Sequence, residues 1–445
     1  RFFFFASYEG LRQRAGINFV ELVPSVAARA RAVPAIQPLL AAYPVGQQPS
    51  VNPDFDFAFL NASARTTENS GGIRLDYRVS DRYSFYLRYF RDQGESRLPL
   101  GVTGNALVVT AVPQNALLNF QQLLSTNIIN ETKIGVNANK TFGQGSAPVV
   151  PGIDVSAISV NMSGSVALSG IAGQGSSAGV AQPGGLVRAN SASNGRGQPY
   201  TNYSLSFIDN LSWVKNQHSI RMGVEVRPIR LKTDRLGGTT YTFSNISDFL
   251  ANRPSQVQFL GDLSAPSPFN NGATGRREAI TAVYSGYAQD EWRPLRSLTM
   301  TYGMRYEYYP VTREARNLNV VFNTVSGQIM PPDTPFYESS RLNFAPRLAF
   351  AWSPQRLNDR TVFRVGAGYY YGPGQTEDQI QPIESDRVST TVSGATYPID
   401  PAAIIAGYDT NNPKLGYQPR AYAPGYRLPE RILSYTASVQ QSLPG

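Results

Sequence analysis

Few residues of this chain have the types and spacing that catalysis or metal binding needs. The 445-residue sequence has one histidine, His218, and no cysteine. A Ser-His-Asp triad would have to use His218, and nothing in the sequence places a nucleophile near it. One histidine without cysteines also makes a transition-metal site improbable. The sequence therefore predicts no enzyme, no metal site and no cofactor.

Two groups of oxygen-bearing side chains could in principle bind Ca²⁺. Asn52, Asp54 and Asp56 form one group, and residues 409–412 form the other. Neither has the full spacing of an EF-hand loop, so solvated turns are the favoured interpretation. The Gly-rich residues 173–179 are not followed by Lys-Ser/Thr and do not predict a phosphate-binding loop. They belong to the Gly- and Ser-rich residues 143–197, which are expected to form a flexible external loop.

A clearer pattern comes from charged residues that occur singly at alternate positions of strand-like segments. These residues are expected to line the wet side of a sheet, with the carboxylates paired to nearby arginines: Arg74, Arg88, Arg221, Glu225, Arg227, Arg305, Glu307, Arg347 and Arg364. The net charge is +9, from 40 Lys and Arg against 31 Asp and Glu. Because the arginines form no basic run or basic helix, nucleic-acid binding is not predicted.

The elements that must position these charges are β-strands, and residues 284–309 show this best. A charged turn at residues 294–297 joins two strands of about a dozen residues each, as in a hairpin. In the second strand, Leu298, Met300, Tyr302, Met304, Tyr306 and Tyr308 share one face, and Thr299, Thr301, Gly303, Arg305 and Glu307 share the other. An apolar face backed by a charged face suits a strand with lipid outside and water inside.

The same unit recurs along the chain and predicts about twelve strands, mostly in hairpins. Short and long connections alternate. The short ones are expected at Ser80 and residues 125–129, 215–218, 294–297 and 353–360, and the long ones at residues 13–69, 92–114, 142–199, 231–280, 310–341 and 373–430. Short periplasmic turns and long extracellular loops characterise outer-membrane barrels. The predicted fold class is therefore an all-β, antiparallel, up-and-down transmembrane β-barrel section.

Aromatic residues support this orientation. Trp213, Trp292 and Trp352 each precede a short turn, where a periplasmic aromatic girdle is expected, although buried tryptophans of a soluble β protein are the alternative. Asp209 departs from the pattern, since it lies in phase with Phe207 and Leu211 and would face lipid. Shielding, protonation or a local bulge would each explain it. Residues 243–254 are expected to form a short helix capped by Ser244 or Asn245.

Several segments together resemble the Oar-like branch of the TonB-dependent receptors of Gram-negative bacteria. They are FFFFASYEGLRQ (2–13), NQHSIRMGVEVR (216–227), YAQDEWR (287–293), LTMTYGMRYEYY (298–309) and NFAPRLAFAWSP (343–354). The resemblance implies an N-terminal carboxypeptidase-regulatory-like domain, a plug and a barrel of about 22 strands. Residues 1–445 would then be part of a single outer-membrane barrel domain, with the regulatory-like and plug domains and the C-terminal strands outside it.

The expected function is that of an outer-membrane TonB-dependent receptor, which imports a large ligand through a plugged lumen with energy from the TonB system. The expected partners are outer-membrane lipid, the plug of the same protein, the TonB system and an unknown extracellular ligand. A surface adhesion or secretion-linked Oar-like protein is one alternative, and a passive pore without energy coupling is another. A soluble β-propeller or sandwich is the last. The sequence names no ligand, full strand count or oligomeric state.

Overall fold

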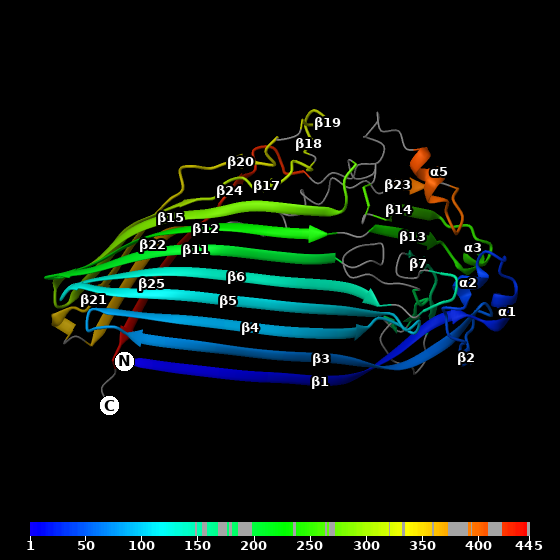
Figure 1. Ribbon diagram of the computed structural model, residues 1–445, viewed down its shortest axis with the longest axis horizontal. Coiled ribbons are helices and arrows are strands. Elements are labelled where there is room, and N and C mark those ends of the chain that lie inside the picture. The colour runs from blue at the N-terminus through cyan, green and yellow to red at the C-terminus, as the bar shows by residue number, and fades with distance from the viewer. Residues whose placement is uncertain are drawn as a thin grey trace.

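The computed structural model describes residues 1–146, 149–153, 158–167, 176–177, 180–185, 198–234, 237–262, 265–266, 272–319, 321–331, 334–357, 360–372, 390–392, 394–407 and 421–442. Most of them belong to one large antiparallel sheet that curves along the length of the molecule (Figure 1). Within these residues, no helix has the length and apolar character needed to cross a membrane.

The main path of the sheet consists of twelve strands, and each pairs with the next one along the chain. They are β1 (Phe2–Pro24), β3 (Phe55–Arg78), β4 (Tyr83–Pro99), β5 (Ala106–Ser125), β6 (Ile128–Ser146), β11 (Gln198–Lys215), β12 (His218–Asp234), β15 (Arg276–Leu295), β16 (Leu298–Tyr308), β21 (Phe344–Trp352), β22 (Thr361–Gly372) and β25 (Glu430–Gln441). β1 and β25 lie at the two ends of this path. The prediction of an all-β, up-and-down antiparallel fold is confirmed.

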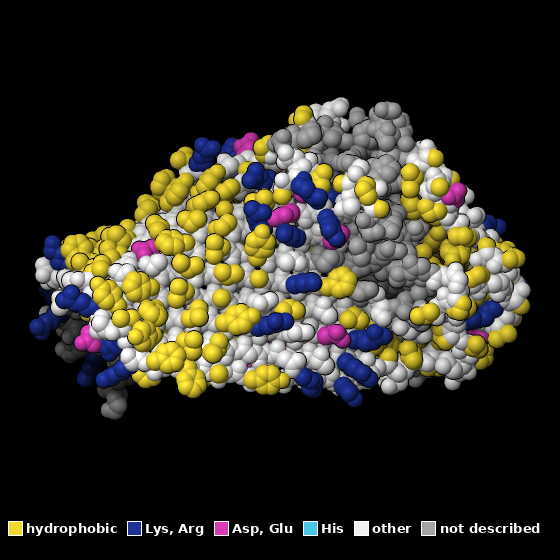
Figure 2. Space-filling model, viewed as in Figure 1, with side chains coloured by type: hydrophobic (Ala, Val, Ile, Leu, Met, Phe, Trp, Pro, Cys, Tyr) yellow, Lys and Arg dark blue, Asp and Glu magenta, His cyan; other side chains and the backbone are white. Residues whose placement is uncertain are grey.

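Strand register separates the two faces of the sheet as the sequence alternation requires. One cross-strand row runs through Leu75, Leu87, Leu118, Ile134, Phe207, Val226, Tyr284 and Tyr308. Most of these side chains are exposed, and apolar side chains cover the outside of the strands (Figure 2). A contiguous exposed apolar surface of this extent is typical of contact with lipid. We call it the apolar face and the opposite side the polar face.

The short connections lie where the sequence predicts them, because each contains a turn that reverses the chain within a few residues. The tight turn between β11 and β12 places Asn216 at φ 54°, a left-handed conformation that asparagine tolerates. The longest of the short connections, between β21 and β22, contains the 3₁₀ turn Gln355–Leu357. Tight turns and long connections alternate along the sheet as expected, except between β4 and β5, where the connection predicted to be long is itself short.

The predicted limits of several long connections were wrong. β1 continues to Pro24 and β3 begins at Phe55, so the first long connection covers residues 25–54 rather than 13–69. The connection between β4 and β5 covers only residues 100–105 rather than 92–114. On the outer side, the extensions of β1, β3 and β4 carry polar residues such as Arg14, Arg65 and Arg97, so the apolar period of that side ends before the strands do. Backbone pairing nevertheless carries the strands beyond the apolar face.

Beyond the strands, the long connections pack together into an outer cap. A four-stranded sheet joins β7 (Ile158–Met162), β13 (Gly237–Phe243), β14 (Gln256–Asp262) and β23 (Thr390–Val392). The short helices α1 (Val26–Ala30), α2 (Gln37–Leu40), α3 (Ile246–Leu250) and α5 (Pro401–Ala406) lie at this end of the molecule (Figure 1). Leu22, Ile36, Leu39, Val160 and Phe249 are completely buried in its core.

Two local predictions have different outcomes in the cap. The predicted helix is α3, and Asn245 is its cap, since its Oδ1 accepts a hydrogen bond of 2.9 Å from the Asp248 N–H. The expectation that residues 143–197 form a flexible loop is wrong for β7. This strand pairs in parallel with β13 and buries Val160, because alternating Ile158, Val160 and Met162 supply an apolar side to the cap.

Candidate functional site

The charged residues predicted to share one side of the sheet do so. A second cross-strand row, on the polar face, runs through Asp76, Tyr86, Asn119, Lys133, Ile208, Glu225, Ser285 and Glu307. By the same register, Arg74, Arg88, Arg221, Arg227, Arg305, Arg347 and Arg364 also lie on the polar face. The nine residues do not form one cluster; they divide into separate groups along the sheet.

The most connected group surrounds Arg305 in the middle of the sheet. Its guanidinium pairs with Glu307, donates a hydrogen bond of 3.0 Å to Ser285 Oγ, and lies 3.9 Å from Glu225 Oε2. Arg227 pairs with the other oxygen of Glu225. The Glu307 side chain is only 7% exposed, and its second oxygen accepts a hydrogen bond of 2.6 Å from Tyr309. Two partly buried carboxylates are therefore balanced by two arginines, which fits ion pairing rather than acid–base chemistry.

A second group lies near the first strands. Arg74 makes two hydrogen bonds to the Asp76 carboxylate, at 2.7 and 2.8 Å, and its guanidinium lies 3.9 Å from the centre of the Tyr86 ring. Arg88 donates a hydrogen bond of 2.8 Å to Asn115 Oδ1. A bidentate ion pair stacked on an aromatic ring holds a guanidinium in a fixed orientation.

The other predicted arginines are less constrained. Arg221 is exposed and, within the described part of the chain, has no ion pair. Arg364 donates a hydrogen bond of 2.9 Å to Gln440 Oε1. Arg347 lies 4.3 Å from the centre of the Tyr370 ring, and its buried Nε has no hydrogen-bond partner among the described residues. Arg347 also borders a cavity of about 170 Å³ beside Gly303 and Arg305.

The three tryptophans lie at the short-turn end of the sheet, within three residues of the end of β11, β15 or β21. Trp292 stacks on His218 with ring centroids 5.6 Å apart, and Lys215 Nζ lies 5.2 Å from the Trp213 ring. Trp352 is 49% exposed and packs on Phe363. The only histidine is thus engaged with a tryptophan and with Asp290, whose Oδ2 lies 2.6 Å from His218 Nδ1.

Asp209 does face the apolar side, and no bulge displaces it. Its register with β6 is regular, opposite Thr132. The carboxylate accepts hydrogen bonds from Thr132 Oγ1, at 2.6 Å, and from Asn130 Nδ2, at 2.9 Å. Local polar partners therefore shield the charge, which was one of the explanations that the sequence left open.

Of the two groups of oxygen-bearing side chains considered for Ca²⁺, the structure describes only Asn52, Asp54 and Asp56. Asn52 Oδ1 accepts a hydrogen bond of 3.0 Å from the Asp54 N–H, as in an Asx turn, and the Asp54 carboxylate pairs with Arg31. Among the described residues, no cluster of three or more His, Cys, Asp or Glu could hold a metal ion. Residues 409–412 lie outside the described residues.

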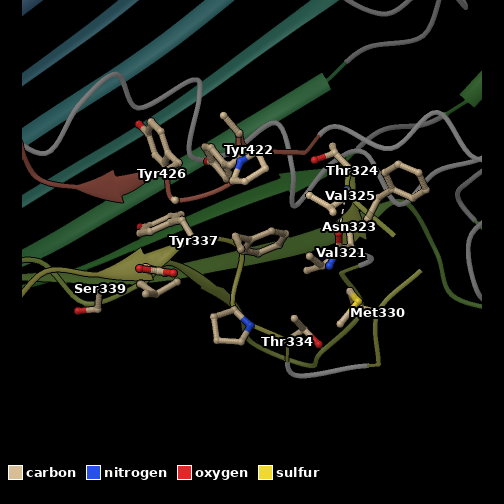
Figure 3. A pocket seen from close by; sticks show the side chains of 18 residues that line it. Val321, Asn323, Thr324, Val325, Met330, Thr334, Tyr337, Ser339, Tyr422 and Tyr426 are labelled. Carbon is tan, nitrogen blue, oxygen red and sulfur yellow. Dashed lines mark hydrogen bonds between the residues drawn. The ribbon is translucent and has the colours of Figure 1, made fainter. Parts of the chain in front are cut away.

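Sequence reasoning missed a cavity of about 700 Å³ between two long connections (Figure 3). Val311, Met330 and residues 321–325 and 334–339, between β16 and β21, form one side, and residues 422–426, before β25, form the other. Tyr422 stacks on Tyr426 with ring centroids 4.7 Å apart, and Tyr337 meets both rings edge-on at 5.3 and 6.0 Å. We call these three residues and the cavity beside them the tyrosine pocket. Its rim carries the ion pair of Glu338 with Arg427.

The tyrosine pocket is anchored on the polar face. Phe336, Tyr337 and Leu428 form a small core with Ala279 of β15, and Leu231 of β12 packs against it. Ala279 and Leu231 lie opposite each other in register, on the same face as Glu225 and Ser285. Aromatic rings with hydroxyl groups form flat, partly polar walls that suit organic ligands.

In the outer cap, burial changes the ionisation of groups far from the sheet. Burial raises the pKa of Tyr241 to about 12, and its hydroxyl oxygen accepts a hydrogen bond of 3.2 Å from the Ile399 N–H. Burial also raises the pKa of Tyr397, whose ring meets that of Tyr241 edge-on at 5.2 Å. The pKa of Arg29 is lowered by burial, while its guanidinium donates hydrogen bonds to the carbonyl oxygens of Pro24 and Leu40. These groups stabilise the cap and form no reactive constellation.

An extended antiparallel meander with an apolar outer side, short turns at one end and folded loops at the other is the architecture of an outer-membrane β-barrel. The family model described as outer membrane beta barrel domain matches residues 26–445. The chain belongs to this family, and its place is the outer membrane. A comparison with curated proteins found no match.

The outer membrane transporter YddB from Escherichia coli aligns with 88% of this chain and 39% of its own, with a TM-score of 0.51 and 12% identity. The copper transporter OprC aligns with 69% of this chain and 37% of its own (TM-score 0.41, 11% identity). P. aeruginosa FpvA bound to pyoverdines aligns with 70% of this chain and 36% of its own (TM-score 0.41, 8% identity).

This chain therefore spans less than two thirds of each of these structures. At these identities the comparison with YddB concerns the fold alone. It supports the predicted barrel fold, whereas the resemblance to the TonB-dependent receptors and to their Oar-like branch stays a prediction.

Proposed function

We propose that this chain is the barrel section of a TonB-dependent receptor that captures an organic ligand at its outer mouth and imports it with energy from the inner membrane. The observation that carries the proposal is the tyrosine pocket, because it is built by two extracellular connections and packs against the polar face. A ligand bound there would lie at the entrance of the lumen.

In this proposal the polar face lines the lumen. The paired charges around Arg305 and Arg74 would present fixed, hydrated groups to a plug domain of the same protein. Such groups support a polar contact without requiring the barrel itself to move. The regulatory-like and plug domains, and further strands that close the barrel, would belong to the full-length protein. Trp213, Trp292 and Trp352 would form the periplasmic girdle.

The test uses cells that express the full-length protein with Tyr422→Ala and Tyr426→Ala, separately and together. Depletion of medium components is followed by mass spectrometry, with and without a protonophore. We expect one component to be depleted by the wild type, to be retained in the medium by the double variant, and to be retained when the protonophore is present. Val51→Ala, an exposed residue of a different extracellular connection, is the matched control.

The alternative functions predict other results. Depletion that continues with the protonophore indicates a passive pore and contradicts energised uptake. A component that stays bound to the cell surface, and is released by washing, indicates an adhesion or capture protein. If the tyrosine variants deplete the medium as the wild type does, the pocket is not the capture site.

A further inference from the structure

The tyrosine pocket carries almost no charge, although the chain as a whole has a net charge of +9. Among the described residues that line it, Glu338 is the only charged one. Its carboxylate adds no net charge, because Arg427 Nε donates a hydrogen bond of 2.8 Å to Glu338 Oε2 and Arg427 Nη2 lies 2.6 Å from the same oxygen. Both side chains of this ion pair are more than half exposed. The wall of the pocket is therefore electrically neutral.

A second cavity at the same end of the sheet has the opposite character. Its volume is about 470 Å³, and it lies at the outer ends of β12 and β15. Four cations and two carboxylates line it, so its net charge is positive. An anionic molecule at the outer mouth would be attracted to this second cavity and not to the tyrosine pocket.

Three polar side chains of the tyrosine pocket are already bonded within the protein. The Tyr337 hydroxyl oxygen accepts a hydrogen bond of 3.0 Å from the Thr312 N–H. Asn323 Oδ1 accepts hydrogen bonds of 2.9 and 3.0 Å from two N–H groups of the turn that follows it. Thr334 Oγ1 donates a hydrogen bond of 2.7 Å to the Pro331 carbonyl oxygen. These groups shape the wall and contribute little to the recognition of a polar ligand.

The walls offer aromatic and aliphatic surface instead. Phe322, Val325 and Met330 face the three tyrosines across the cavity (Figure 3). Phe336 is 8% exposed and Tyr337 is 7% exposed, so the inner wall is fixed in the small core that packs on β15. Apolar walls that are rigid before a ligand arrives favour an apolar ligand, because little ordering is needed on binding.

The two connections that form the pocket are also joined to each other. β20 (Glu338–Ser339) pairs in parallel with β24 (Arg427–Leu428), directly beside the tyrosine cluster. The pairing fixes Tyr337 on one connection next to Tyr426 on the other, since each is the residue that precedes the paired strand. The pocket therefore has a defined shape and volume in the absence of a ligand.

We propose that the tyrosine pocket takes an uncharged organic molecule with an aromatic or aliphatic body, and that it rejects the charged form of the same molecule. This inference rests on the proposed function, because it names the class of ligand that the capture site takes. An ionised group buried against these walls would lose its hydration without gaining an ion pair. An uncharged aromatic group would lose little hydration and would gain ring packing and apolar contact.

The test uses the full-length protein in neutral detergent and three small peptides that share two phenylalanine rings and differ in charge. N-acetyl-phenylalanyl-phenylalanine amide is uncharged, N-acetyl-phenylalanyl-phenylalanine is an anion, and phenylalanyl-phenylalanine amide is a cation. Equilibrium dialysis measures the affinity for each peptide, with protein-free micelles as the blank. The double variant Tyr422→Ala/Tyr426→Ala defines the binding that belongs to the pocket, because the anion also has the second cavity available.

A charge introduced into the wall gives an independent variant. Val325 lines the pocket and is 80% exposed, so Val325→Lys leaves the buried core intact. Val51→Lys is the matched control, because Val51 is 87% exposed and lies on a different connection. The heat-modifiable band verifies that each variant is folded.

We expect the wild type to bind the uncharged peptide at least about tenfold more tightly than either charged peptide. The double variant should lose at least about tenfold in affinity for the uncharged peptide. Val325→Lys should bind the anionic peptide about fivefold more tightly than the wild type does, because a cation now stands in the wall. Val51→Lys should bind all three peptides as the wild type does.

Three results overturn the inference. The first is equal or tighter pocket binding of a charged peptide by the wild type. The second is no binding of the uncharged peptide above the micelle blank. The third is a preference for the uncharged peptide that persists unchanged in the double variant, which would place the binding outside the pocket. Failure of the proposed function is a separate outcome, because uptake that continues with a protonophore contradicts energised import and leaves the peptide preference unchanged.

Discussion

The ring of Tyr287 lies across Gly223 on the polar face, in the space where any other residue would carry its side chain. A Cβ at position 223 would stand 2.8 Å from Tyr287 Cε1 and would clash with Asn210 Oδ1. The Tyr287 hydroxyl donates a hydrogen bond of 3.0 Å to that same Asn210 oxygen, on the strand beyond. Because Gly223 has no side chain, Tyr287 of β15 can cross β12 and form a hydrogen bond with Asn210 of β11.

Gly223→Ala should therefore lower the free energy of unfolding by about 1–3 kcal/mol, the usual range for overpacking. Urea unfolding in micelles, followed by the loss of the heat-modifiable band, measures it. Gly286→Ala is the matched control, because a Cβ there meets no atom closer than 3.7 Å. If both variants are equally stable, the packing of Tyr287 on Gly223 does not constrain the sheet.

Removal of the Arg305 guanidinium should be costly, since two carboxylates depend on it. Arg305→Met leaves Glu307, at 7% exposure, without its cation and Glu225 with Arg227 alone. Loss of one partner from a buried ion pair typically costs about 3–5 kcal/mol, and partial exposure of Arg305 places the expected value near the lower end, at about 3 kcal/mol. Arg221→Met, on the same face but exposed, should change stability by less than about 0.5 kcal/mol. Equal losses of stability in Arg305→Met and Arg221→Met would show that the ion pairs around Arg305 do not stabilise the sheet.

Thr132 should matter because it shields a charge that faces lipid. Thr132→Val removes one of the donors to Asp209, and we expect a loss of about 2 kcal/mol in unfolding free energy. In an Asp209→Asn background, the same substitution should cost less than about 1 kcal/mol, because a neutral amide loses less than a carboxylate when one hydrogen-bond donor is removed. A double-mutant cycle in micelles gives the coupling, and a coupling near zero would rule out the shielding.

The two faces should differ in their access to water. The chain has no cysteine of its own, so single substitutions report one position each. Arg221→Cys, on the polar face, should react with a membrane-impermeant thiol reagent in intact outer membranes. Met222→Cys, the next residue along β12 and on the apolar face, should react only after detergent is added. Equal reaction of both would show that the strand does not separate lipid from water.

High pH should destabilise the outer cap through Tyr241. Its pKa is raised from 10.0 to about 12 in the folded cap, so the stabilisation is complete below pH 10 and is lost as the pH rises through about 12. Limited proteolysis at pH 9 to 12 should show the cap opening over this window. Tyr241→Phe removes the ionisable group and should shift the opening to higher pH; an unchanged profile would exclude Tyr241 as the cause.

The sheet could be predicted from sequence where one face is apolar, as in β16, where Leu298 to Tyr308 alternate without a break. The strand extensions could not, because Arg14, Arg65 and Arg97 follow no hydrophobic period and are positioned by backbone pairing alone. The tyrosine pocket could not be predicted from the sequence either. Tyr337 and Tyr422 are 85 residues apart in the sequence, and only tertiary packing brings them together. Ion pairs along one strand, such as Arg305 with Glu307 and Arg227 with Glu225, follow from the alternation and were predictable.

The outer cap joins segments that lie far apart in the sequence. β7, β13 and β23 come from three different connections, and Asn252 and Tyr397 exchange hydrogen bonds of 2.6 and 2.7 Å between two of them. Leu22 at the outer end of β1 adds a bond of 2.9 Å to Gln182. Mechanical strain on one connection is therefore transmitted to the others. An insertion or a protease cut in one of these three connections should change the exchange of amide hydrogens in the other two.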